Sequence, residues 1–407
     1  MAKTTSTKPF NHYDFPSDWK VIELSKVGIF SKGKGILKEQ VIASGLPCIR
    51  YGEIYTTHDF IIKEFKSFIS EDVARESQEI KNGDVLFAGS GETLEEIGKS
   101  VAYIGNEKAY AGGDVIILST NSNVKAECLS YALETDFVRK QKRRYGQGQQ
   151  VVHIYPSDLA KVKVALPPLP EQKAMAHILS LMDVAISKNN QLIAQKELRK
   201  KWLMQNLLTG KKRLKRFDGK WKEYKLEHFI EEYNEKPKDG ISYEVFTSSK
   251  TGLMKQTDYY GDNRITNRED ADYNVIPPNY LTYRSRSEVG LFTFNKNNLG
   301  VLGLVSGYYP VFTIKNGSLD FILMYCNYHK HKLKKFSIGT SQLVLSMSAL
   351  KTATFVFPNE KEQAAIAEVL QAADKEIQLL KTKTEKLGEQ KKGLMQILLT
   401  GKKRLKI

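Results

Sequence analysis

The residues best suited to chemistry in this 407-residue chain are arginines and amides gathered in loops. Arg can hydrogen-bond guanine and Gln can hydrogen-bond adenine in the DNA major groove, while Arg, Lys and Ser also hold phosphates. Each residue taken singly is as readily a solvated surface group, but their clustering favours a DNA-contact surface. The candidates in the first half are Arg50, Tyr51, Arg143, Arg144, Gln147, Gln149 and Gln150. Those in the second half are Arg264, Arg268, Arg284, Arg286, Tyr309, Ser341 and Gln342.

The charge balance supports a polyanionic partner. The formal net charge is +16, from 62 Lys and Arg against 46 Asp and Glu. A surplus of this size speaks to partners rather than to fold, and nucleic acid is the leading candidate. An anionic membrane surface is the rival, but no strongly basic amphipathic helix with an aromatic face stands out, so we expect no membrane partner.

Signatures of catalysis and of metal binding are missing. Gly98-Lys99-Ser100 resembles the end of a phosphate-binding loop, but the spacing back to Gly91 is wrong. The seven His residues, including His329 and His331, lack Cys or carboxylate neighbours at ligand spacing, and we expect them on the surface. The sequence therefore predicts no catalytic residue and no metal site.

Cysteine usage and the first residues indicate a cytoplasmic protein. Cys48, Cys128 and Cys326 are few, odd in number and far apart, which fits neither a disulfide framework nor a metal site. A reducing compartment is the natural setting for such a chain. Residues 1–10 carry no apolar signal region, and no apolar run is long enough to span a bilayer.

The chain contains an internal repeat that organises these candidates. The stretch from Leu203 to Lys215 returns from Leu394 to Lys406, an offset of 191 residues. The same offset carries Glu171-Gln172 onto Glu362-Gln363. It also aligns an amide-bearing loop that follows a basic helix in each half. The repeat therefore predicts two similar halves.

Each repeated stretch reads as a long helix with an apolar seam, in which the positions are spaced alternately by four and three residues. The apolar seam positions of the first helix are Met175, Leu179, Met182, Ile186, Ile193, Leu203 and Leu207. Those of the second are Ile366, Leu370, Ile377, Leu380, Leu387, Leu394 and Leu398. Polar positions interrupt both seams, at Asn189, Lys196 and Lys200 and at Thr384 and Lys391.

A seam of this kind requires a partner helix, and two similar helices most simply pair antiparallel. The alternative is that each helix packs separately on its own core. Pro167 and Pro358 mark the helix starts, and Gly210 and Gly401 suit the cap positions that follow the helix ends.

The remaining segments read as short strands and turns without regular βαβ units, which favours an α+β fold with two mixed, β-rich globules. We predict an N-terminal globular domain at 1–165, a central spacer helix at 166–210, a C-terminal globular domain at 211–357, and a distal helix with a basic tail at 358–407. Both globular segments open with Phe, Trp and Leu at similar spacing: Phe15, Trp19 and Leu24, then Phe217, Trp221 and Leu226.

These features together resemble the specificity subunit of Type I restriction-modification systems. The resemblance rests on the two Pro-then-Glu-Gln helix starts, the doubled Leu-Leu-Thr-Gly-Lys-Lys-Arg-Leu-Lys endings and the Phe/Trp/Leu openings, and it covers essentially the whole chain. It implies two target-recognition domains, each reading one part of a bipartite, asymmetric site in double-stranded DNA. It also implies an antiparallel coiled coil of the two helices and a pseudo-twofold relation of the halves.

The family further implies two methyltransferase subunits bound by the helices, joined by restriction subunits. Those partners would use S-adenosylmethionine, magnesium and ATP, and this chain would hold no cofactor and catalyse nothing. A seam of about 33 residues makes a rod of roughly 50 Å, against roughly 34–36 Å for one DNA turn. The helices are therefore predicted to set the spacing of two unlike readers.

Two other readings stay open from the sequence alone. One is a stand-alone DNA methyltransferase or nuclease with degenerate motifs. The other is a basic coiled-coil scaffold that binds RNA or lipid without reading sequence. A reader of sequence should lose non-specific binding steeply with salt and keep a preferred site.

Overall fold

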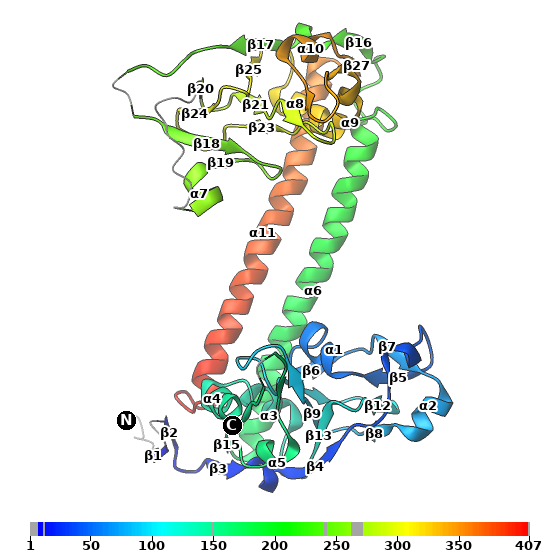
Figure 1. The fold of residues 1–407 in the computed structure, drawn as a ribbon, viewed down its shortest axis with the longest axis vertical. Helices are drawn as coiled ribbons and strands as arrows, with labels where there is room; N and C mark the ends of the chain where they lie inside the picture. Colours follow the sequence, from blue (N-terminus) through cyan, green and yellow to red (C-terminus); the bar gives the residue numbers. More distant parts are fainter. Residues whose placement is uncertain (1–6, 11–12, 149, 240–241, 262–271, 406–407) are drawn as a thin grey trace. The chain divides into compact units, whose positions relative to one another are not determined.

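The computed structural model describes residues 7–10, 13–148, 150–239, 242–261 and 272–405 (Figure 1). The chain divides into two compact units. Unit 1 comprises residues 1–190 and 382–407, and unit 2 comprises residues 191–381. Each unit thus contains one β-rich region together with part of both long helices, so we describe each unit by itself.

Both long helices that the repeat predicts are present. Helix α6 spans Leu169–Leu207 and helix α11 spans Glu360–Leu398, each 39 residues long. The two starts and the two ends are 191 residues apart, so the structure keeps the offset of the repeat. Gly210 and Gly401 follow the helix ends with φ of 70° and 71°, the left-handed conformation that glycine adopts without a Cβ penalty.

The seam positions lie on the less exposed face of each helix and alternate with exposed flanks. In unit 1 the buried or half-buried seam residues are Met175, Leu179, Met182, Ile186 and Asn189 of α6 and Thr384, Leu387, Lys391, Leu394 and Leu398 of α11. In unit 2 they are Ile193, Lys196, Lys200, Leu203 and Leu207 of α6 and Ile366, Leu370, Ala373, Ile377 and Leu380 of α11.

Ion pairs between the two helices fix their direction within unit 2. Lys196 pairs with Glu376 and Lys200 with Asp374, so positions that rise along α6 fall along α11. The helix segments of unit 2 therefore run antiparallel. These pairs also explain why the seam tolerates Lys at two of its positions, because each ammonium group meets a carboxylate of the other helix.

Unit 1 is built on two mixed sheets. The larger has the order β4-β13-β9-β11-β6 and the smaller β7-β5-β12-β8. In both, a parallel pair lies beside antiparallel pairs, since β6 pairs parallel with β11 and β5 with β12. The strands are β4 (Gly28–Lys32), β5 (Leu46–Ile49), β6 (Ile61–Ile62), β7 (Ser67–Ile69), β8 (Gln78–Ile80), β9 (Asp84–Ala88), β11 (Ser100–Tyr103), β12 (Ala109–Ala111) and β13 (Val115–Thr120).

Smaller strand pairs and helices complete unit 1. The pairs are β1 (Thr7–Phe10) with β2 (Tyr13–Pro16), β3 (Lys20–Glu23) with β15 (Lys163–Leu166), and β10 (Ser90–Gly91) with β14 (Val152–His153). The helices are α1 (Tyr51–Thr56), α2 (Glu71–Glu76), α3 (Ala126–Ala132), α4 (Asp136–Tyr145) and α5 (Pro156–Leu159). The main core gathers Trp19, strand residues such as Phe87, and Met175 of α6 with Leu398 of α11. The helix ends are thus part of the core of this unit.

Unit 2 is also built on two sheets, one antiparallel in every described pair and one with a parallel pair, β18 with β24. Its sheets have the orders β17-β25-β21-β23 and β19-β18-β24-β20, flanked by the pairs β16-β27 and β22-β26. The strands are β16 (Lys222–Lys225), β17 (Ile230–Tyr233), β18 (Glu244–Ser248), β19 (Leu253–Lys255), β20 (Tyr273–Ile276), β21 (Leu281–Tyr283), β22 (Arg286–Ser287), β23 (Phe294–Lys296), β24 (Gly303–Ser306), β25 (Val311–Ile314), β26 (Leu343–Val344) and β27 (Thr354–Phe357). The helices are α7 (Gln256–Tyr260), α8 (Leu319–Tyr328), α9 (Lys330–Leu333) and α10 (Met347–Thr352).

The α+β prediction is confirmed in both units. The core of unit 2 joins aromatic side chains of its sheet, such as Tyr283 and Phe312, to Leu207 of α6 and Ile366 of α11. The four-segment division of the chain stays a prediction. By packing, each β-rich region forms one compact unit with the start of its own helix and the end of the other.

Candidate nucleic-acid interface

A hollow of about 700 Å³ in unit 2 brings together four of the residues singled out in the sequence, Arg284, Arg286, Tyr309 and Gln342. Its wall adds two lysines and two further tyrosines, and among the described residues that line it Glu288 is the one carboxylate. These additional lining residues are Lys250, Lys330, Tyr259 and Tyr260. Cationic and aromatic side chains around one hollow suit phosphate contact and base stacking.

Backbone anchoring holds the arginines of this hollow in place. Arg284 follows β21, whose Tyr283 is fully buried and donates its hydroxyl to the Leu345 carbonyl at 3.0 Å. Between the two arginines, the Ser285 hydroxyl donates to the Tyr308 carbonyl at 2.5 Å. The Arg286 guanidinium then lies 3.7 Å from the centre of the Tyr308 ring. This stacking orients the planar donor group before any ligand arrives.

The phenol of Tyr309 lies in the same wall. Burial raises its pKa above the ordinary value, and the nearby Arg284 charge acts in the opposite direction. Like an ordinary tyrosine, it is neutral at neutral pH. Sequence reasoning found Tyr309 through its loop, but it missed Tyr259 and Tyr260 because they lie on the short helix α7, without a turn signature of their own.

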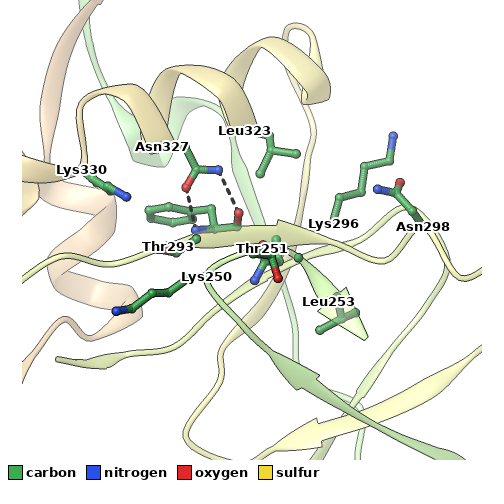
Figure 2. A pocket seen from close by; sticks show the side chains of 12 residues that line it. Lys250, Thr251, Leu253, Thr293, Lys296, Asn298, Leu323, Asn327 and Lys330 are labelled. Carbon is green, nitrogen blue, oxygen red and sulfur yellow. Dashed lines mark hydrogen bonds between the residues drawn. The ribbon is translucent and has the colours of Figure 1, made fainter. Parts of the chain in front are cut away.

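A second hollow, of about 540 Å³, adjoins the first and shares Lys250, Thr251, Thr293 and Lys330 with it. Figure 2 shows the ammonium groups of Lys250, Lys296 and Lys330 around it. The amide of Asn327 fixes the strand behind them, because it accepts from the Phe294 N–H at 2.9 Å and donates to the Phe294 carbonyl at 2.8 Å (Figure 2). The basic segment around Lys330 was visible in the sequence, whereas Lys250 had no signal there.

In unit 1 the candidates come from two elements. Arg50 precedes α1 and is half-buried, with Tyr51 40% exposed after it. Arg143, Arg144, Gln147 and Gln150 are exposed at the end of α4 and in the loop that follows. Arg143 pairs with Glu95 at 2.8 Å, which leaves its charge partly neutralised.

A side-chain contact links these two elements of unit 1. Tyr55 of α1 donates to the Glu96 carbonyl at 3.3 Å, and its hydroxyl lies so close to Gly91 that a Cβ there would meet it at 2.6 Å. Gly91 belongs to β10, which pairs with β14 beside the loop. The two groups of candidates therefore flank one short strand. In unit 2, Ser341 is exposed next to Gln342. Gln149, Arg264 and Arg268 lie outside the described residues.

The expectation that the histidines are surface groups is wrong for His58 and His329, which are 6% and 5% exposed. Burial lowers the pKa of His329 to about 4, and its Nε2 lies 3.3 Å from the Leu208 carbonyl. The ring is therefore a neutral part of the core that anchors the end of α6. Over the part of the chain that the structure describes, no group of three or more His, Cys, Asp or Glu could hold a metal ion.

Comparison with known families decides what this scaffold is. The family model for the Type I restriction modification DNA specificity domain matches residues 16–197 and again 219–389. The chain belongs to that family. The two matches cover both halves of the repeat, so each β-rich region with its long helix corresponds to one specificity domain.

Several proteins match this specificity subunit over nearly its whole length. The MjaVIII Type I specificity subunit of Methanocaldococcus jannaschii is 24% identical over 99% of this chain and 97% of its own. The crystal structure of a Type I S subunit from M. genitalium is similar with a TM-score of 0.59 and 13% identity, covering 97% of this chain and 98% of that one. The HsdS subunit of Thermoanaerobacter tengcongensis gives a TM-score of 0.52 at 18% identity, covering 96% and 99%. At these identities the structures show a shared fold.

Membership of the family identifies the chain as a specificity subunit with DNA-recognition domains. The readings as a stand-alone methyltransferase or as an RNA scaffold are not favoured by this membership. Among the described residues, no helix is long and apolar enough to cross a membrane.

Proposed function

We propose that each unit of this specificity subunit reads one part of a bipartite, asymmetric DNA site. The observation that carries the proposal is that the two units share a frame but differ in their contact residues. Arg404 donates two hydrogen bonds of 2.7 Å to the Glu171 carboxylate. Arg213, 191 residues earlier, makes the same bidentate contact with Glu362. The candidate interfaces carry no such copy, since Arg284 and Arg286 have no arginine counterpart at the same offset.

The helices are the proposed docking surface for two methyltransferase subunits. Apolar side chains on the outer face of α6 support this role, because large exposed apolar groups beside a satisfied seam indicate a protein partner. Those in unit 1 are Leu181 and Val184, and those in unit 2 are Leu192, Leu198 and Trp202, joined by Leu379 of α11. Restriction subunits would join that core.

Catalysis and cofactors belong, in this proposal, to the partners. S-adenosylmethionine, magnesium and ATP would be used by the methyltransferase and restriction subunits, while this chain binds and positions the DNA. The cytoplasm is the proposed place of action, and three buried free thiols suit that reducing compartment.

The test is modification mapping of DNA from cells that make this chain with its partner methyltransferase. The expected result is one split site with two unlike halves and a fixed gap. As the control, the purified chain alone is incubated with labelled S-adenosylmethionine and DNA, and we expect no methyl transfer. Methylation by the chain alone, or modification without any sequence preference in the full complex, would contradict the proposal.

A further inference from the structure

Each unit carries the same small hairpin beside its candidate interface. In unit 1 the Gln147 N–H donates to the His153 carbonyl at 2.9 Å, and the His153 N–H donates back at 2.7 Å. In unit 2, Ile338 and Val344 exchange the same two bonds at 2.9 and 2.8 Å. Both pairs lie 191 residues apart, so the repeat extends into regions whose sequences otherwise differ.

The turn of both hairpins depends on glycine. Gly148 and Gly339 both have φ of 121°, a backbone conformation that residues other than glycine rarely adopt. A Cβ on Gly148 would lie 2.0 Å from the Val151 carbonyl oxygen, and one on Gly339 would lie 2.3 Å from that of Gln342. The two turns are therefore one structural device, built twice.

A two-residue strand pairs with the base of each hairpin. In unit 1, β10 pairs with β14 and sets Ser90 opposite His153. In unit 2, β22 pairs with β26 and sets Arg286 opposite Val344. Since His153 and Val344 are equivalent by the repeat, Ser90 and Arg286 occupy the same place in the ladder. Their sequence separation is 196 rather than 191 residues, so only strand pairing reveals the match.

The side chains of this cross-strand pair differ between the units. Unit 1 has the buried Ser90 hydroxyl 2.9 Å from Nδ1 of His153, which orients an exposed imidazole. Unit 2 has Arg286, stacked on the exposed Tyr308 ring and facing the hollow that Arg284 and Gln342 also line. One frame thus presents an imidazole in one unit and a guanidinium in the other.

We propose that this cross-strand pair beside the hairpin, Ser90–His153 in unit 1 and Arg286–Val344 in unit 2, determines specificity in each unit. The Arg286 guanidinium reads a guanine through O6 and N7, and His153 reads a base of the other half-site. The inference rests on the proposed function and deepens it. Two observations favour Arg286 as a reader of bases. Its guanidinium is stacked on the Tyr308 ring, and no ion pair engages it within the described part of the chain. In addition, the donor geometry of a guanidinium matches a bidentate contact to guanine.

The test uses the chain co-expressed with its partner methyltransferase and maps modified sites for Arg286→Ala, Arg286→Lys and His153→Ala. Losing a bidentate contact should reduce discrimination at one G·C pair of one half-site on the order of 10- to 100-fold, with the other half-site unchanged. Arg286→Lys should relax the same pair to a smaller extent. His153→Ala should alter the other half-site only. The matched control is Lys255→Ala, an exposed cation of the same unit that pairs with Glu244 and should leave the site unchanged.

Several outcomes would overturn the inference. One is an unchanged site in Arg286→Ala. Another is an equal loss on all sequences, which would make Arg286 a phosphate contact. If Arg286→Ala abolishes all modification, the Arg286→Lys variant becomes the deciding test. Reduced discrimination at one G·C pair in that variant supports guanine recognition by Arg286, and an unchanged recognition site overturns it. A wild-type complex without any sequence preference would instead refute the proposed function, so the two failures are distinguishable.

Discussion

The two copies of one ion pair show how burial changes the role of identical residues. In unit 1, Lys391 pairs with Asp183 at 2.5 Å, with side chains only 8% and 12% exposed. The ammonium group lies 3.9 Å from the centre of the Phe60 ring, and Asp183 also accepts from the Tyr131 hydroxyl at 2.6 Å. The repeat partners Lys200 and Asp374 make the same pair in unit 2 at 28% and 50% exposure. Burial lowers the pKa of Lys391 and Asp183 opposes that shift, so the ammonium depends on its carboxylate.

Removing the carboxylate should therefore be costly in one copy and cheap in the other. We expect Asp183→Ala to destabilise unit 1 by about 3 kcal/mol, because it leaves a buried ammonium without its partner. The matched Asp374→Ala should cost less than about 1 kcal/mol, because solvent screens an exposed pair. Hydrogen exchange measured by mass spectrometry in the full chain reports the peptides of each unit separately. Similar losses in the two variants would show that burial does not decide the strength of this pair.

At the scale of elements, the sequence predicted the features that depend on residues close together in the chain. The heptad seam, the prolines and the Thr-Gly endings act within a few residues, and they predicted both long helices and their ends. The order of strands in the sheets could not be predicted in this way, because it depends on pairing between distant segments. The equivalence of Ser90 and Arg286 was hidden for the same reason. The burial of His329 was not predicted because it comes from packing against Leu208 and Phe355, which are far from it in the sequence.

The hairpins give a prediction that belongs to the element rather than to one contact. Gly339→Ala should force the turn of unit 2 out of its conformation at a strain of about 1–3 kcal/mol. Because a change in this turn would move Ser341 and Gln342, we expect weaker recognition of one half-site. Gly148→Ala should weaken the other half-site. Gly219→Ala is the control, since a Cβ there meets nothing within 4 Å. Competition binding with DNA altered in one half-site at a time measures the effect. If either variant weakens both half-sites equally, the hairpins do not act separately.

At the scale of the whole molecule, each unit is completed by the other half of the sequence. Arg404 near the end of the chain binds Glu171 at the start of α6, and it also bonds Asp18 at 2.9 and 2.8 Å. Arg213, after α6, binds Glu362 at the start of α11, where that carboxylate is fully buried. The hydrogen bonds to Glu171 and Asp18 raise the pKa of Arg404 further above its ordinary value, because they stabilise the charged guanidinium. Neither the Arg404–Glu171 contact of unit 1 nor the Arg213–Glu362 contact of unit 2 can form within one half of the repeat alone. Both long helices are therefore required to complete each unit.

The continuity of the helices from one unit into the other leads to the last prediction. The unit boundaries fall between Asn190 and Gln191 in α6 and between Lys381 and Thr382 in α11. Adding one heptad at both points keeps the seam in register and lengthens each helix by about 10 Å. If the helices set the spacing of the two readers, the gap between the half-sites should grow by about 3 base pairs, at 3.4 Å per pair. Modification mapping with the partner methyltransferase measures that gap. A heptad inserted in α6 alone would misalign the two seams and should abolish modification. An unchanged gap in the double insertion would refute the prediction that the helices set the spacing of the half-sites.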